Sequence, residues 1–337
     1  MRLLALASLS VLSASRAATI VEDFSTNPLT NGWQIFGETN LFVWNPTNRD
    51  LQVTWDSSRS NSYFYYPLGA QFTRSDDLSV EFDLNLADIT SGAEAGKTGP
   101  MEIGIGFLNS ADAMGTSFMR GVWGGAPNVA EFDYYPAGYY EFGGSELPIA
   151  ATTTPAFIAG TDSQHYAPEY LGSYEYGLPT SQSFHVRLNY DGLSQAATLV
   201  VTTNGLPLEV LPALVLNSAT NSQFTGADNF SVDMVSISSY SSSGDDYDSV
   251  LAHGTVGNLI VKASIRAIGR LSGDFTTNGV WEARFLGRTN WLYTLERTTD
   301  FGSWTPVSAT LGGVEDEMIL QDTNALAAKA FYRVRAQ

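Results

Sequence analysis

Two carboxylates, Glu131 and Asp133, have the residue types and spacing that could do chemistry in this chain. They lie in the stretch NVAEFDYYPAGYYEF at 128–142, where polar and apolar residues alternate. Alternate residues of a β-strand share a face, so both carboxylates point to one side and Phe132 and Tyr134 to the core. Such a pair could bind a cation, accept hydrogen bonds from sugar hydroxyls or transfer protons.

Aromatic residues flank the two acids in the manner of a sugar-binding site. Aromatic rings stack on the C–H faces of sugars, while acids and amides beside them bind the hydroxyls. Two further candidates, a histidine and an arginine, share one face of a later strand. The predicted ligand-binding residues are therefore Glu131, Asp133, Tyr135, Tyr139, Trp123, His185 and Arg187.

The same tripeptide, Glu-Phe-Asp, also occurs at 81–83. It lies in the cleanest alternating strand of the chain, where its acids form the polar face of an amphipathic strand. Glu131 and Asp133 could likewise be no more than the polar face of an amphipathic strand. This is the alternative to a role in ligand contact or in catalysis.

Metal and nucleophile motifs are absent from the sequence. There is no cysteine, and His165, His185 and His253 share no ligand spacing. Asp245, Asp246 and Asp248 lie in a Ser/Gly loop, but without the order of an EF-hand. We expect no cofactor, and a structural calcium ion in this loop is the one option left open.

The composition excludes several partners. The 337 residues include 35 acidic and 17 basic ones, giving a net charge of −18. Binding to nucleic acid or to an anionic membrane needs clustered Lys and Arg, so neither is expected. Charged residues make up only 15% of the chain, which is typical of an exported β-protein with polar, uncharged turns.

The N-terminus has the pattern of a secretory signal. Arg2 precedes an apolar run at 3–14, and Ser-Arg-Ala follows at 15–17. We predict a signal peptide at 1–17 with cleavage after Ala17, and a secreted or cell-surface protein. No other segment is long and apolar enough to span a bilayer. Export without cysteine favours a bacterial source.

Short alternating strands with turn signals between them fill the chain up to residue 268. Nothing sustains a helical period, although 107–119 could hold a short helical turn. Many short strands at regular spacing predict an all-β fold, a large antiparallel β-sandwich or jelly roll, at 19–268. The strands are expected at 33–43 with a break at Gly37, and at 51–55, 62–66, 78–86, 101–108, within 128–142, and at 184–191, 197–203, 230–238 and 258–265.

Two stretches are expected to be loops, 144–182 with its prolines and tyrosines and the polar 240–249. A shift in composition near Arg270 separates a second region. Five short strands with their own aromatics follow, enough for a small C-terminal β-module at 273–337.

Two motifs resemble the concanavalin-A-like superfamily of L-type lectins and laminarinase-type glycoside hydrolases. They are Val-Ala-Glu-Phe-Asp at 129–133 and His-Val-Arg-Leu-Asn-Tyr-Asp at 185–191. The C-terminal region, with Leu-Glu-Arg-Thr-Thr-Asp-Phe-Gly-Ser-Trp at 295–304 and Phe-Tyr-Arg-Val-Arg at 331–335, is similar to a β-module that recurs on exported bacterial proteins.

The chemistry that this resemblance implies does not transfer in full. The hydrolases use Glu-x-Asp-x-x-Glu, and the third acid is replaced here by Pro136. The lectins bind metals through further ligands, which are replaced by Ala137 and Phe142. We therefore expect a secreted, non-catalytic, lectin-like protein that recognises a polysaccharide or glycan on the concave sheet face. Two alternatives stay open: a glycoside hydrolase or polysaccharide lyase with a non-standard acid, and a structural or adhesive surface protein.

Overall fold

The structure is a computed structural model, and it contains two compact units that divide after Ala17 and after Ala263. The large unit is Ala18–Ala263, and the small unit combines the N-terminal residues with the C-terminal part of the chain. The structure describes residues 9–12, 16–120, 128–134, 136, 153–158, 178–207, 214–215, 230–242, 248–289, 291–314, 316–325 and 330–337.

The large unit contains a six-stranded sheet with the order β11-β10-β9-β16-β6-β3. Every neighbouring pair in it is antiparallel. Its strands are β3 (Gln34–Phe36), β6 (Ser62–Thr73), β9 (Ile103–Leu108), β10 (Val129–Tyr134), β11 (Thr153–Ile158) and β16 (Ser231–Ser239).

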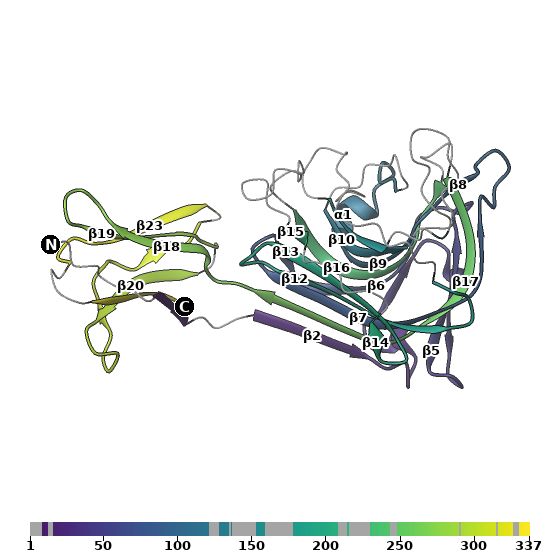
Figure 1. Ribbon diagram of the computed structural model, residues 1–337, viewed down its shortest axis with the longest axis horizontal. Helices are drawn as coiled ribbons and strands as arrows, with labels where there is room; N and C mark the ends of the chain where they lie inside the picture. The colour runs from purple at the N-terminus through teal and green to yellow at the C-terminus, as the bar shows by residue number, and fades with distance from the viewer. Residues whose placement is uncertain are drawn as a thin grey trace. The chain divides into compact units, whose positions relative to one another are not determined.

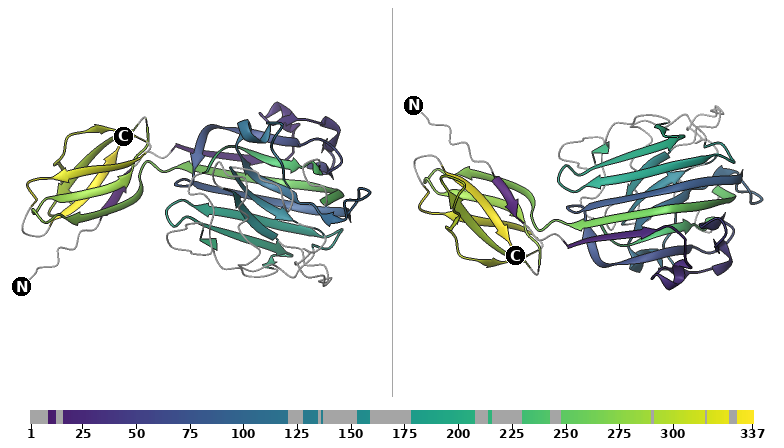
Figure 2. Two further views of the ribbon diagram at one scale, coloured as in Figure 1. Left: turned by 90° about the horizontal axis from the view of Figure 1, so that it is seen from above. Right: turned by 90° about the horizontal axis from the view of Figure 1, so that it is seen from below.

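The second sheet of this unit has ten strands, with the main order β14-β13-β12-β7-β17-β5-β4. Strand β15 pairs with β13, while β2 and β8 pair with β17. Figure 2 shows these strands side by side in the view from below. They are β2 (Arg16–Glu22), β4 (Phe42–Asn45), β5 (Asp50–Asp56), β7 (Asp77–Ser91), β8 (Gly99–Pro100), β12 (Ser183–Asp191), β13 (Ala196–Thr203), β14 (Leu206–Pro207), β15 (Leu214–Val215) and β17 (Asp248–Ile265).

The two sheets stack face to face around a buried apolar core. Phe82 of β7 meets Phe132 of β10 at a ring distance of 5.7 Å, and Phe42 of β4 meets Phe64 of β6 at 6.1 Å. Each strand therefore turns its apolar face to the other sheet, as alternation requires. The predicted antiparallel β-sandwich is confirmed.

Helices are few among the described residues. They are the short 3-10 helices η1 (Pro28–Thr30) and η2 (Thr39–Leu41) and the single-turn helix α1 (Ser110–Ala113). Figure 1 shows α1 above the concave side of the six-stranded sheet. The Tyr63 hydroxyl on this side donates to the carbonyl of Ala113 at 3.0 Å, which holds the helix there. The helical turn expected within 107–119 is confirmed.

The structure corrects two loop expectations. Strand β11 lies inside 144–182 and pairs with β10 at the edge of the six-stranded sheet. Its Pro155 obscured the pattern, but an edge strand tolerates a proline because one side of its backbone needs no partner. Strand β17 begins at Asp248, within the stretch expected to be the second loop, and runs ten residues further towards the N-terminus than predicted.

Two strand boundaries also differ from the prediction. The stretch 33–43 is broken by η2 into β3 and β4, which belong to different sheets. Gly37, whose φ is +82°, lies at this break, where the sequence pattern is also interrupted. Strand β6 continues past Pro67 to Thr73 because the irregular pairing with β16 accommodates the proline.

The hairpin predicted at Asp191 and Gly192 is confirmed by the antiparallel pair β12 and β13. A Cβ atom on Gly192 would lie 2.3 Å from the carbonyl carbon of Ser75, so only glycine fits there.

The small unit contains a five-stranded and a three-stranded sheet. Its core includes Trp281 stacked on Tyr332 at 3.8 Å with an interplanar angle of 6°. The first sheet has β1 (Leu9–Leu12), which pairs in parallel with β24 (Phe331–Ala336), and β20 (Leu292–Thr298), β21 (Thr305–Pro306) and β22 (Leu311–Gly312). The second has β18 (Gly269–Phe275), β19 (Trp281–Leu286) and β23 (Glu317–Asp322).

Candidate functional site

Glu131 and Asp133 lie on the face of β10 that points away from the core, on the concave side of the six-stranded sheet. Their neighbour Phe132 faces the core, so the alternation places both acids on the opposite side, as predicted. Opposite them on β9 are two glycines, since Glu131 pairs with Gly106 and Asp133 with Gly104.

The two glycines make room for the acids. A Cβ atom on Gly104 would lie 2.7 Å from Glu131 Oε2, and one on Gly106 would lie 2.4 Å from the Glu131 Cα atom. The next strand, β16, continues both rows with Ser236 and Ser238, whose hydroxyls are 2.9 Å apart. Cross-strand partners share a face, so glycine, serine and carboxylate together form the floor of the concave side.

A single guanidinium, that of Arg120, holds the acids together. Its Nη2 atom lies 2.9 Å from Glu131 Oε1 and 3.0 Å from Asp133 Oδ1. Its Nε atom lies 3.0 Å from Oε1 of a third acid, Glu102. The four side chains, which we call the Arg120 cluster, have 0% exposure.

Tyr240 covers the cluster. Its hydroxyl donates to Glu131 Oε2 at 2.6 Å, and the Arg120 guanidinium lies 5.3 Å from the centre of its ring. Tyr63 packs against Tyr240 with a ring distance of 6.1 Å. The aromatic rings complete a low-dielectric enclosure around the charges.

The Arg120 cluster contains three acids and one base, and burial therefore changes their ionisation. Burial raises the pKa of Asp133 well above its usual value, and the nearby Glu131 carboxylate raises it further. Burial also raises the pKa of Glu131, against the opposing effects of Arg120 and of the Tyr240 hydrogen bond. Burial raises the pKa of Tyr240 in the same way, so its hydroxyl remains a donor.

This arrangement suits a structural cluster better than a catalytic one. Glu102 does supply the carboxyl from another segment that a hydrolase would need. A hydrolase also needs one carboxyl open to substrate and one open to water, with defined separation between them. In the Arg120 cluster all three carboxyls are closed off from solvent and bound to one cation.

An open groove of about 520 Å³ lies on the same side of the sheet. It combines one aromatic ring with amide, hydroxyl and carboxylate groups. Its walls come from β6, from β16 and from the residues around α1. The lining residues are Tyr65, Pro67, Gly69, Ala70, Gln71, Ser110, Met114, Asp233 and Met234.

An irregularity in the sheet creates this groove. The pairing of β16 with β6 passes from Val232 opposite Phe72 directly to Met234 opposite Pro67. The residues 68–71 of β6 thus lack regular partners, and Gly69 adopts a φ of +70° within them. Such bulges redirect side chains, and here Asp233 accepts two hydrogen bonds from Ser110, at 2.7 Å and 2.8 Å.

His185 and Arg187 lie elsewhere. Both belong to β12 of the ten-stranded sheet, and their neighbour Val186 is buried in the core, so they point to the outer face of that sheet. His185 contacts Glu81 Oε1 at 3.1 Å and Asp83 Oδ1 at 2.8 Å. The structure therefore does not bring these two residues together with Glu131 and Asp133.

Three predicted contacts, Trp123, Tyr135 and Tyr139, fall outside the described residues, as do Asp245 and Asp246 of the possible calcium loop. Asp248 is buried at the start of β17. Within the part of the chain that the structure describes, no three His, Asp or Glu side chains are arranged to hold a metal ion. In the same part, no helix has the length and apolarity to cross a membrane.

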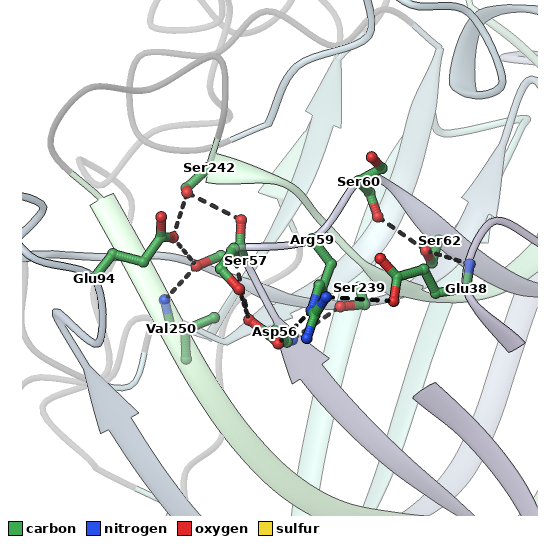
Figure 3. Close-up of polar contacts among 11 residues, drawn as sticks. Glu38, Asp56, Ser57, Arg59, Ser60, Ser62, Glu94, Ser239, Ser242 and Val250 are labelled. Carbon is green, nitrogen blue, oxygen red and sulfur yellow. Dashed lines mark hydrogen bonds and ion pairs between the residues drawn. The ribbon is translucent and has the colours of Figure 1, made fainter. Parts of the chain in front are cut away.

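A second polar network lies where the turn after β5 meets the segment after β7 (Figure 3). The Ser57 hydroxyl donates to Glu94 Oε1 at 2.9 Å and accepts from the Val250 backbone at 2.8 Å. The Ser242 hydroxyl donates to the Ser57 carbonyl at 3.0 Å and also bonds Glu94. The network fixes Ser242 and Val250, on either side of residues 243–247, to the same end of the sandwich.

Sequence reasoning missed three members of this site, Arg120, Glu102 and Tyr240. Arg120 had a detectable signal, because it is the only Lys or Arg between Lys97 and Arg187. Glu102 shares the alternation of Gly104 and Gly106, which places it on the same strand face. Tyr240 had no signal, since it is one of 16 tyrosines and meets Glu131 across 109 residues of chain.

No family model and no curated protein matches the chain. Solved structures that resemble it include lectins. Peanut lectin is 11% identical, with 75% of this chain and 100% of that chain covered and a TM-score of 0.44. The seed lectin of Lotus tetragonolobus is 9% identical, with 74% and 99% covered and a TM-score of 0.40.

The carbohydrate recognition domain of Emp46p is 12% identical, with 70% of this chain and 91% of that chain covered and a TM-score of 0.35. These lectins have the concanavalin-A-like fold that the two sequence motifs resemble. At such identities the likeness concerns the fold alone.

Proposed function

We propose that this chain is a secreted, non-catalytic, carbohydrate-binding protein that recognises a polysaccharide or glycan on the concave side of the six-stranded sheet. The observation that carries the proposal is the groove beside α1. It presents the Tyr65 ring together with Gln71, Ser110 and Asp233. A ring that can stack on a sugar, beside groups that bind hydroxyls, is the chemistry of a glycan site.

The Arg120 cluster lies beside this site on the same sheet face, because Glu131 and Tyr65 belong to one cross-strand row. Its buried ion pairs fix the floor of the concave side, and the aromatic enclosure keeps its carboxyls from acting on a bound sugar. Among its lining residues the groove presents a single carboxylate, that of Asp233, and not the pair of carboxyls that glycoside hydrolysis uses.

Export is part of the proposal and is supported by the N-terminal sequence pattern. Cleavage after Ala17 would remove β1 and leave β24 as an edge of its sheet. Mass spectrometry of the protein recovered from an exporting host tests this. We expect an N-terminus at Ala18, and an intact Met1 on exported protein would contradict it.

Glycan-array and polysaccharide pull-down measurements on the full chain test the binding function. We expect binding to at least one glycan, and an about tenfold weaker affinity for Tyr65→Ala, corresponding to ~1.4 kcal/mol. Tyr65→Phe keeps the ring and should bind like the parent.

A matched control is Arg187→Ala on the outer face of the other sheet, which should leave the affinity unchanged. Absence of binding to any glucan, galactan or host glycan would favour the structural or adhesive alternative. Release of reducing ends or unsaturated products from a polysaccharide would favour the enzymatic one.

A further inference from the structure

The distribution of cationic side chains indicates what kind of glycan the groove can take. Residues 18–263 contain 27 acidic and only seven basic residues. All seven belong to the described part of the chain, so their positions can be followed completely. They are Arg49, Arg59, Arg74, Lys97, Arg120, Arg187 and Lys262.

Four of these seven basic side chains contact other groups of the protein. Arg120 is enclosed in its cluster, and Arg74 is buried and donates to Gln195 Oε1 at 2.8 Å. Lys97 contacts the Ser242 carbonyl at 2.8 Å. Arg59 lies 3.2 Å from Asp56 Oδ2.

The other three belong to strands and turns of the ten-stranded sheet. Arg187 and Lys262 are exposed on β12 and β17, between buried neighbours that face the core. Arg49 lies in the turn between β4 and β5. None of the seven lines the groove.

The sequence shows that the chain segments adjoining the concave side also lack cationic residues. The stretch 121–186, which contains β10 and β11, has no Lys or Arg, and neither has 188–261. Binding of an anionic polymer needs such side chains to neutralise its charges, and a net negative surface repels it over about 10 Å at moderate salt. An acidic glycan in the groove would therefore be repelled and would form no ion pair to compensate for the repulsion.

The polar groups of the groove suit hydroxyl groups instead. Asp233 accepts hydrogen bonds from Ser110, and carboxylate oxygens have further lone pairs that can accept from sugar hydroxyls. Gln71 bears both a donor and an acceptor, and its amide donates to Ser231 at 3.1 Å. The Tyr65 hydroxyl donates to Gln34 at 2.7 Å, so the ring is the part of this side chain that is left for a sugar to contact.

We propose that the ligand of the groove is an uncharged glycan, bound by stacking on Tyr65 and by hydrogen bonds to Gln71, Ser110 and Asp233, and that acidic polysaccharides are excluded. The inference rests on the proposed carbohydrate-binding function and assigns its substrate class. Because no ion pair forms with such a ligand, its affinity is independent of salt.

The test compares uncharged and acidic polymers of similar length on the full chain. Laminarin, galactan and mannan represent the first class, and alginate, polygalacturonate and a sulfated galactan the second. We expect an uncharged polymer to bind with an affinity that changes less than about twofold between 20 and 300 mM NaCl, because no counterions are released. Acidic polymers should not bind at either salt concentration.

Tighter binding of an acidic polymer than of any uncharged one would overturn the inference while leaving carbohydrate binding intact. Absence of binding to both classes would overturn the proposed function itself, and the inference with it. The two failures are therefore distinguishable.

A variant sharpens the assignment to the groove. Gln71→Lys adds a cation there, and we expect weaker binding of the uncharged glycan and new, salt-sensitive binding of the acidic polymers. The matched control, Ser79→Lys on β7 of the ten-stranded sheet, adds the same charge outside the groove and should do neither. Equal behaviour of the two variants would show that the groove does not select the ligand.

Discussion

The chain contains the tripeptide Glu-Phe-Asp twice, and the structure places the two copies back to back across the sandwich. Phe82 of the first and Phe132 of the second meet in the core. Outside the core their acids differ. The side chains of Glu81 and Asp83 are 30% and 35% exposed, whereas those of Glu131 and Asp133 are 0% exposed. The local sequence determines which way a strand faces, but not what lies above that face.

The partners of the two acid pairs follow from this difference. Glu81 and Asp83 contact His185 and Asn258 in the presence of water, where such contacts contribute little to stability. Glu131 and Asp133 share the Arg120 guanidinium in a dry enclosure, where losing one partner leaves a charge uncompensated. The two copies therefore form an internal comparison that mutations can break or sharpen.

The largest expected effect is that of Arg120→Leu. It leaves the buried carboxyls of Glu102, Glu131 and Asp133 without their cation, so the free energy of unfolding should fall by about 3–5 kcal/mol. His185→Leu, the matched change at the other tripeptide, should cost at most about 1 kcal/mol. Urea unfolding followed by tryptophan fluorescence measures both.

A neutral version of the cluster separates charge from packing. Arg120→Leu combined with Glu102→Gln, Glu131→Gln and Asp133→Asn removes all four charges together. We expect it to recover most of the lost stability, because replacing a whole buried ion set is often tolerated. Equal losses for Arg120→Leu and His185→Leu would refute the comparison.

A smaller effect is expected from Tyr240→Phe. The variant keeps the ring above Arg120 but removes the 2.6 Å hydrogen bond to Glu131. A bond to a charged group contributes about 1.5–3 kcal/mol when buried, so the free energy of unfolding should fall by that amount. Asn258→Ala removes a bond of equal length to the exposed Asp83 and should cost less than about 0.5 kcal/mol. If Asn258→Ala lowered the free energy of unfolding as much as Tyr240→Phe, the contrast between the buried and the exposed acids would be contradicted.

The smallest effect concerns pH. Burial and the neighbouring Glu131 raise the pKa of Asp133 in the folded protein above its ordinary value of 3.8. An acid with a raised pKa contributes stability that is present below pH 3.8 and is lost as the pH rises through the folded value. The free energy of unfolding should therefore decline above pH 3.8 by a contribution that Asp133→Asn abolishes.

Urea denaturation of the parent and of Asp133→Asn between pH 4 and 8 measures this contribution. It is the difference between the two proteins in how steeply the free energy of unfolding changes with pH. At pH 4, where the raised pKa keeps Asp133 protonated in the folded protein, the Asn side chain imitates the acid, so its cost there should stay below about 1 kcal/mol. Parallel curves for the parent and Asp133→Asn would show that the buried acid does not titrate in this range.

Much of the fold could be predicted because it depends on local patterns. The alternation at 128–134 predicted β10 and its facing, and Gly192 predicted a hairpin between β12 and β13. Where a pattern was interrupted, the prediction failed. Pro155 hid the edge strand β11, and Pro67 hid the continuation of β6 to Thr73.

The candidate site was less accessible to prediction. Its groove arises from a register shift between β16 and β6, and pairing registers are set by long-range contacts. Gln71 and Asp233 both line the groove, although the Gln71 amide reaches Ser231 across 160 residues of chain and no motif links these segments.

Some properties of this protein follow from its sequence alone. The near absence of Lys and Arg between residues 121 and 261 holds whatever the fold, and it leaves this stretch almost without cations for an anionic ligand. The alternation likewise determined that two strands each turn a Glu and an Asp away from the core.

Only the tertiary structure decided that one of these pairs is buried around Arg120 and the other exposed beside His185. The physical reason is that desolvation of a carboxylate depends on every group packed above it. Those groups come from segments that the sequence keeps far apart.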